Sequence, residues 1–180
     1  DVDVARKMDA LTDVWVPHHK YHFAADHKAF FEFLRSTQKP HWCYFYSEGG
    51  NDKAQNPTRH YLAKFWWAFS EGVTGVCYWA QQYYGDPWYR AGWKQSYDTS
   101  LVYPLPGGVA PSRRWQAWRR GWQDYNLLFL ARESAVKAGD KAKQEQLARH
   151  VEEVVKVPGD PQKAEAVRAW LKRLLLERPG

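Results

Sequence analysis

Aromatic and amide side chains at the end of one apolar segment could recognise a sugar. The segment 75–84 begins as an apolar run after a glycine and ends in amides and phenols, which is typical of a buried strand that delivers polar groups to a pocket. Alternation along the strand places Trp79, Gln81 and Tyr83 toward one side. A ring stacks on the C–H face of a pyranose and an amide hydrogen-bonds its hydroxyl groups, so these residues form a predicted substrate platform. Trp88 in the next loop either extends the platform or pins the loop.

Glu48 is the one carboxylate that the sequence singles out as a catalytic candidate. The β-prone run 41–48 places four residues on one side of a strand: Trp42, Tyr44, Tyr46 and Glu48. We predict that Tyr46 and Glu48 bind substrate, because polar residues at the strand ends of barrels are often site residues. Glu48 would hydrogen-bond a sugar hydroxyl or tune an acid. Alternatively, it caps the turn at Gly49-Gly50 or pairs with an arginine.

Three histidines and a tyrosine crowd the loop after the first predicted strand. These residues are His18, His19, Tyr21 and His22. Crowded histidines can bind zinc, but the sequence assures neither a third ligand nor a carboxylate beside them, so we expect no metal and no cofactor. We assign His18 and Tyr21 to hydrogen bonding with a sugar. A solvated loop is the structural alternative.

Strands and helices alternate along the first part of the chain. We predict strands near 13–17, 41–48 and 75–84, with helices near 27–36 and 57–69 between them. That alternation implies parallel strands joined by right-handed crossovers, and hence an α/β fold. The polar and aromatic loops all follow strands, as they do on the active-site face of a (β/α)8 barrel.

Residues 112–180 are predicted to form helices that complete the fold. Ser112 should cap a long helix, and Gly139-Asp140 should separate it from the next one. The long helix carries aromatic residues three or four positions apart: Trp115, Trp118, Trp122, Tyr125 and Phe129. This spacing predicts a core-packing stripe. On the same helix, we expect Arg113 and Arg119 to form a structural ion-pair and capping set near Asp124.

The composition describes one globular domain that is unusually rich in aromatic residues. The 180 residues include 11 Trp, 11 Tyr and 8 Phe, which suits a cleft for sugars, bases or cations. The net charge of +6 permits nucleic-acid binding. Basic and acidic residues are mixed along the C-terminal helices, however, so nucleic-acid binding is the least favoured of three hypotheses.

No apolar run approaches the roughly 20 residues that span a bilayer, so we expect no membrane partner. Cys43 and Cys77 fall in apolar strands, where we expect free thiols rather than a disulfide.

Several motifs taken together resemble one bacterial carbohydrate-active family. They are Leu101-Val102-Tyr103-Pro104, Pro111-Ser112-Arg113, Arg119-x-Gly121-x-x-Asp124-Tyr125, Trp42 with Tyr44, Trp66-Trp67, and Gly72-Val73-Thr74-Gly75 before Tyr78-Trp79. Over roughly residues 10 to 130, the chain resembles the catalytic domain of glycoside hydrolase family 123, often described only as a domain of unknown function. Two departures are visible, since Arg120 and Asn126 stand where the family usually has acidic residues.

The resemblance implies a TIM-like (β/α)8 barrel with a helical C-terminal extension, of which this chain is the C-terminal part. Residues 1–111 would supply about three parallel strands with crossover helices and substrate-face loops, and residues 112–180 would pack on the barrel. The family removes β-linked N-acetylgalactosamine, using the acetamido group of the substrate as nucleophile and an adjacent Asp-Glu pair. Because the chain has no Asp-Glu dipeptide, the resemblance implies sugar-binding aromatics without the catalytic pair.

The expected function is therefore that of a glycoside-hydrolase-like domain acting on N-acetylhexosaminides in a longer parent, and inactive alone. The expected partners are a carbohydrate and the missing N-terminal half of the barrel. The absence of an initial Met agrees with a fragment or a processed piece. An extracellular or periplasmic location is implied by the resemblance alone. The alternative is a non-catalytic carbohydrate-binding or structural module.

Overall fold

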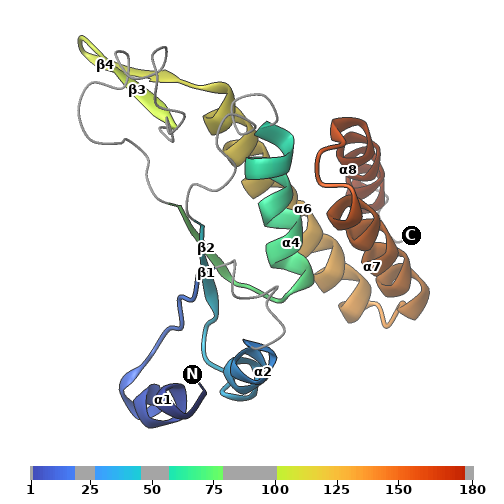
Figure 1. Cartoon of the computed structure of the whole chain (residues 1–180). Coiled ribbons are helices and arrows are strands. Elements are labelled where there is room, and N and C mark those ends of the chain that lie inside the picture. Colours follow the sequence, from blue (N-terminus) through green and yellow to red (C-terminus); the bar gives the residue numbers. More distant parts are fainter. Residues whose placement is uncertain (1, 19–26, 46–56, 79–100, 177–180) are drawn as a thin grey trace.

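The computed structural model describes residues 2–18, 27–45, 57–78 and 101–176 as a mixed α/β structure that is mostly helical. In chain order its elements are α1 (Val2–Met8), η1 (Asp9–Leu11), α2 (Lys28–Ser36), β1 (Trp42–Phe45), η4 (Thr58–Leu62), α4 (Ala63–Ser70), β2 (Gly75–Tyr78), β3 (Val102–Leu105), β4 (Gly108–Pro111), α6 (Arg113–Lys137), α7 (Lys141–Lys156) and α8 (Pro161–Leu176). The predicted α/β class is confirmed. The described strands do not close a barrel (Figure 1).

A small parallel sheet forms the centre of the N-terminal part. β1 and β2 pair in parallel, and α4 lies in the connection between them. The extended segment 15–18 lies along the other edge of β1, where Tyr44 N–H donates to the Pro17 carbonyl over 3.0 Å. Three parallel extended segments with helices between them therefore agree with the strand order predicted from the sequence.

Four helices pack into the main core. α6 contacts α4, η4, α7 and α8, and the four helices α4, α6, α7 and α8 lie side by side (Figure 1). Their shared core contains the fully buried Trp66, Leu128 and Leu171. The C-terminal helices thus reach the sheet chiefly through α4, whose other side packs on β1 and β2.

The helix boundaries after residue 112 follow the predicted caps. The Ser112 hydroxyl accepts a hydrogen bond from the Trp115 N–H over 3.1 Å at the start of α6. Gly139 ends the helix with a φ of +65°, a left-handed conformation that favours glycine. Asp140 then caps α7 by accepting from Lys143 N–H over 2.9 Å. These signals are local, which is why the sequence locates them correctly.

The predicted core stripe of α6 is confirmed for Trp118 and Tyr125, which pack against the core, and is wrong for Trp122 and Phe129. Trp122 is 53% exposed and Phe129 is 41% exposed. The fully buried face is made of smaller residues: Gly121, Asp124, Leu128, Ala131 and Ala135. A Cβ at Gly121 would lie 2.4 Å from the Phe65 ring, so α4 approaches the α6 backbone closely at this point. The face of α6 that carries the small side chains therefore packs against α4, and the largest aromatic rings lie at the edges of that face.

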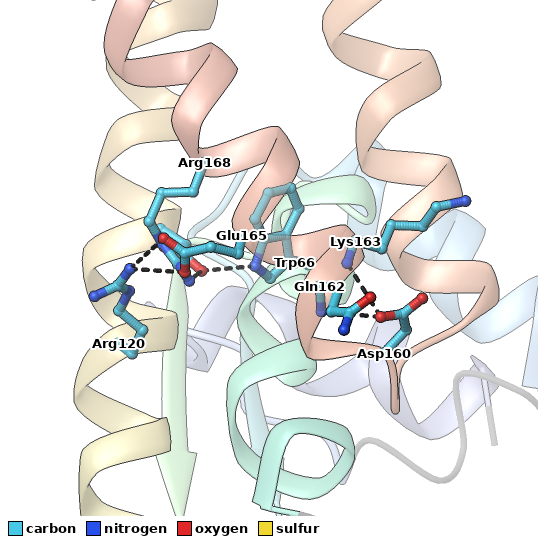
Figure 2. Close-up of polar contacts among 8 residues, drawn as sticks. Trp66, Arg120, Asp160, Gln162, Lys163, Glu165 and Arg168 are labelled. Carbon is cyan, nitrogen blue, oxygen red and sulfur yellow. Dashed lines mark hydrogen bonds and ion pairs between the residues drawn. The ribbon is translucent and has the colours of Figure 1, made fainter.

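The predicted partners of Asp124 are also wrong. Asp124 is fully buried and is bound by Arg168 of α8, rather than by Arg113 or Arg119 of its own helix. Figure 2 shows Trp66, Arg120, Glu165 and Arg168 gathered where α4, α6 and α8 meet. The sequence could not reveal this pairing, because Asp124 and Arg168 come from different helices.

β3 and β4 form a separate antiparallel hairpin at the start of α6. The turn between the two strands has Gly107 at a φ of +79°, a left-handed conformation that favours glycine. Pro104 pairs with Val109 within the hairpin. A proline is tolerated in this position because a two-stranded ribbon consists of edges.

Candidate ligand-binding face of the parallel sheet

One face of the parallel sheet is covered by helices. The His41 ring stacks on Phe31 of α2 with centroids 5.8 Å apart, and the Phe45 ring meets Trp67 of α4 at 5.7 Å. Cys43 between them is fully buried. Because successive side chains of a strand point to opposite faces, Trp42 and Tyr44 lie on the other side of β1. This is the side to which the sequence assigned them.

That other side, called the open face below, comprises His18, Trp42, Tyr44, Gly75 and Cys77. The register pairs Trp42 with Gly75 and Tyr44 with Cys77, and His18 pairs with Tyr44 from the segment 15–18. Trp42 and Gly75 form a lower row. His18, Tyr44 and Cys77 form an upper row, which is nearer the carboxyl ends of the strands. None of the five is fully buried.

The lower row is a close contact between a ring and a glycine. A Cβ added at Gly75 would lie 2.5 Å from the Cγ and Cδ1 atoms of Trp42. The indole ring therefore lies directly over the backbone of β2, in space that only glycine leaves free. Trp42 is still 39% exposed. The sequence alone does not single out this contact, although a glycine within a strand often marks such a close approach.

The upper row combines an imidazole, a phenol and a thiol. The His18 and Tyr44 rings meet edge to face, with centroids 5.5 Å apart and planes at 70°. Both can hydrogen-bond as donor and acceptor, depending on the protonation of the histidine. The row is suited to binding a hydroxyl-rich ligand above it. It contains no carboxylate and hence no acid–base pair for glycoside hydrolysis.

The two cysteines are free, as expected from the sequence. Burial raises the pKa of the Cys43 thiol to about 12, with the Lys64 ammonium acting in the opposite direction. Burial also raises the pKa of Cys77. Since the thiolate is the nucleophilic form, neither cysteine is activated for covalent catalysis.

A second polar contact stands at the carboxyl end of β2 on the covered side. The Tyr61 and Tyr78 hydroxyl groups lie 3.1 Å apart, and the Tyr78 ring packs 5.2 Å from that of Trp118. This contact fixes the residue that precedes the predicted sugar platform. It was not foreseen, because Tyr61 belongs to the π-helical turn η4 at the start of the crossover helix.

Of the eight predicted substrate-binding residues, the structure describes His18. The other seven lie outside the described residues: Tyr21, Tyr46, Glu48, Trp79, Gln81, Tyr83 and Trp88. Each of them follows one of the three parallel segments in the chain, which end at His18, Phe45 and Tyr78. The carboxyl ends of parallel strands meet at one edge of a sheet. Their assembly around the upper row remains a prediction.

The described residues contain neither a metal-ion cluster nor a membrane-spanning helix. Within them, no three His, Cys, Asp or Glu side chains gather in a way that could hold a metal ion. His19, Tyr21 and His22 lie outside the described residues, so the histidine-rich loop is not tested. No helix in the described part of the chain is long and apolar enough to cross a membrane.

No family model matches the chain, and no curated protein matches it.

Proposed function

We propose that the chain is a carbohydrate-active, glycoside-hydrolase-like domain that binds N-acetylhexosaminides. The proposal combines the motifs that resemble glycoside hydrolase family 123 with the arrangement of the open face. In this proposal the chain is the C-terminal part of a TIM-like barrel. It contributes the binding surface and leaves the acid–base chemistry to an Asp-Glu pair on another strand, since its own 180 residues contain none.

The upper row carries the proposal. His18 and Tyr44 stand side by side on the open face, directly below the strand ends that lead to Tyr46, Glu48 and Trp79. In (β/α)8 enzymes the substrate lies at the carboxyl ends of the strands, where rings and polar groups from several strands converge. The row would thus form the floor of the sugar site.

The lower row has a different role in the proposal. Parallel sheets are normally buried on both faces, yet helices cover only one face among the described residues. No described strand pairs with the outer edge of β2 or of the segment 15–18. Further β/α units would extend the sheet at these edges and bury Trp42 as a core layer. The missing N-terminal half of the barrel is accordingly the proposed protein partner.

Sugar binding is tested by titrating the chain with the N-acetylgalactosamine and N-acetylglucosamine monosaccharides in a calorimeter. We expect measurable binding that Trp79→Ala and His18→Ala each weaken by about tenfold, since a stacked ring or a polar anchor contributes on the order of 1 kcal/mol. Leu176→Ala is the control, because Leu176 is 80% exposed at the end of α8 and does not belong to the open face. Binding that both site variants retain would contradict the proposed cleft.

The catalytic part is tested separately with chromogenic β-N-acetylhexosaminides. The chain alone should not release the chromophore, and clear turnover would refute the absence of a catalytic pair.

The nucleic-acid alternative predicts instead an affinity for oligonucleotides that falls steeply with added salt. An affinity that does not change with salt would exclude that alternative.

A further inference from the structure

The long helix α6 carries a second apolar stripe, on the side away from the core. Trp122, Phe129 and Val136 repeat every seven residues, which is close to two helical turns, so they lie along one line. They are 53%, 41% and 55% exposed, and the adjacent Leu130 is 53% exposed. These four residues are called the outer stripe below. Exposed apolar residues aligned along a 25-residue helix mark a surface on which another protein segment can pack.

The rings of the outer stripe are held in place by their neighbours. Trp122 stacks nearly parallel to Tyr125, with planes at 8°, and meets Phe65 edge to face at 6.3 Å. The Arg132 guanidinium lies 5.4 Å from the centre of the Phe129 ring. The stripe is therefore anchored along one margin and open outward. A partner helix would meet a surface that needs little rearrangement.

Arg119 and Glu133, beside the outer stripe, have opposite charges but lie too far apart to pair within one chain. Arg119, Asn126 and Glu133 also repeat every seven residues, alongside the stripe. Arg119 is exposed and Glu133 is half-buried. Neither makes an ion pair with another described residue. The two charges lie at equal distances on either side of Asn126.

We propose that α6 pairs with α6 of a second copy of this chain, antiparallel and about a two-fold axis at Asn126. In an antiparallel pair centred there, residues equally far from Asn126 on opposite sides face each other. Arg119 of one copy then meets Glu133 of the other, and Trp122 meets Leu130. A two-fold interface uses the same surface patch on both copies. Here Arg119 with Glu133 is complementary in charge and Trp122 with Leu130 in apolar surface, whereas Phe129 and Val136 meet Gln123 and Gln116. This inference is independent of the proposed sugar site.

The interface is small, which sets the expected affinity. A helix of this length spans roughly 37 Å, so one helix pair falls at the low end of specific interfaces. We therefore expect a dissociation constant on the order of micromolar. Sedimentation velocity over a range of protein concentrations should show a monomer converting to a dimer. A chain that stays monomeric well above this range overturns the proposal.

The apolar contact is tested by Leu130→Lys. The side chain is exposed in the monomer, so the variant should fold, and circular dichroism checks this. We expect dimerisation to weaken at least about tenfold, because two lysines would be buried against Trp122. Leu176→Lys is the matched control, since Leu176 is 80% exposed at the end of α8. A dimer that survives Leu130→Lys and Leu176→Lys equally well overturns the proposal.

The charges test the orientation of the two helices. Arg119→Glu places glutamate against Glu133, and Glu133→Arg places arginine against Arg119, so each variant alone should dimerise about tenfold more weakly than the wild type. An equimolar mixture of the two variants restores opposite charges at both contacts and should form a heterodimer. Arg173→Glu on α8 controls for the change in net charge. A mixture that associates no better than its components overturns the antiparallel pairing.

A cysteine placed on the axis gives an independent readout. Asn126→Cys should form a disulfide-linked dimer under mild oxidation, because the two copies of residue 126 face each other. Arg119→Cys should not, because its two copies lie about 21 Å apart along an antiparallel pair. The wild type controls for Cys43 and Cys77. Cross-linking of both variants to the same extent would indicate a parallel pair and overturn the proposal.

Discussion

Arg168 of α8 donates two hydrogen bonds to the carboxylate of Asp124 on α6, with both N···O distances at 2.5 Å. The Asp124 side chain is fully buried, and Arg168 is 3% exposed. The Trp66 indole N–H adds a third hydrogen bond to the carboxylate over 3.0 Å. Glu165 accepts from Arg168 and also from Arg120, which extends the pair to the surface (Figure 2). One buried ion pair thereby joins α4, α6 and α8.

Breaking this pair should destabilise the chain strongly. Arg168→Met leaves the Asp124 carboxylate buried with Trp66 as its remaining partner, so we expect a loss of about 3–5 kcal/mol in the free energy of unfolding. The double variant Asp124→Leu/Arg168→Met removes both charges and should lose less than Arg168→Met alone. Urea unfolding of the wild type and of both variants measures these losses.

The exposed end of the same network gives the control. Arg120→Met removes an ion pair to Glu165 whose side chains are 40% and 60% exposed, so we expect a change of about 0–1 kcal/mol. If Arg168→Met cost no more than Arg120→Met, the buried pair would not hold the helices together as described.

Gly121→Ala should disrupt the contact between α6 and the start of the crossover helix. The new Cβ would lie 2.4 Å from the Phe65 ring and 2.9 Å from the Leu62 carbonyl oxygen. Alanine is favoured over glycine in a helix by about 1 kcal/mol, but overpacking against backbone typically costs about 1–3 kcal/mol, so we expect a net loss of stability. Thermal unfolding measures it. Gly108→Ala, where no atom lies within 4 Å, should leave the melting temperature nearly unchanged.

His41 should make the stability of the fold depend on pH. Burial, with a smaller effect from Arg35, lowers the pKa of His41 from 6.5 to about 4. The native state therefore holds the neutral ring, while the unfolded state takes up a proton below pH 6.5. Stability from this group is complete above about pH 6.5 and is lost as the pH falls toward 4, by on the order of 3 kcal/mol. His41→Phe should flatten this part of a pH series of urea unfolding curves, and an unchanged slope would contradict the assignment.

The two thiols should differ in their rates of alkylation. Cys43 is fully buried with a pKa raised to about 12, whereas Cys77 is half-buried on the open face. Iodoacetamide at mildly alkaline pH should modify Cys77 slowly in the native chain and Cys43 only after unfolding, because the thiolate must form and be reached. Mass spectrometry of native and denatured samples distinguishes the two sites. Modification of Cys43 in the native chain at the rate of Cys77 would be inconsistent with the sheet as described.

The open face shows that the alternation of residues in a strand predicts the orientation of side chains but not the contacts between strands. Alternation alone put Trp42 and Tyr44 on one side of β1, and the structure confirms it. Alternation did not reveal that Gly75 lies beneath the Trp42 ring, because the register between two strands depends on how the crossover helix packs. The residues predicted to bind sugar, apart from His18, lie outside the described residues, and their roles stay predictions.

The buried face of α6 was predicted less accurately than the helix itself. The aromatic spacing on α6 identified the helix correctly but assigned Trp122 and Phe129 to the core. A long helix with apolar residues on two sides can bury either of them. In this structure the side with Gly121 and Ala131 is buried, because a neighbouring helix can approach that side most closely.

The sequence by itself determined the α/β class, the order of the elements and the caps at Ser112 and Asp140, because these depend on residues within one or two turns of each other. Only the tertiary structure decided which face of α6 is buried and that Asp124 pairs with Arg168. Those outcomes depend on contacts between segments that are distant in the chain, and local preferences do not specify which segments will meet.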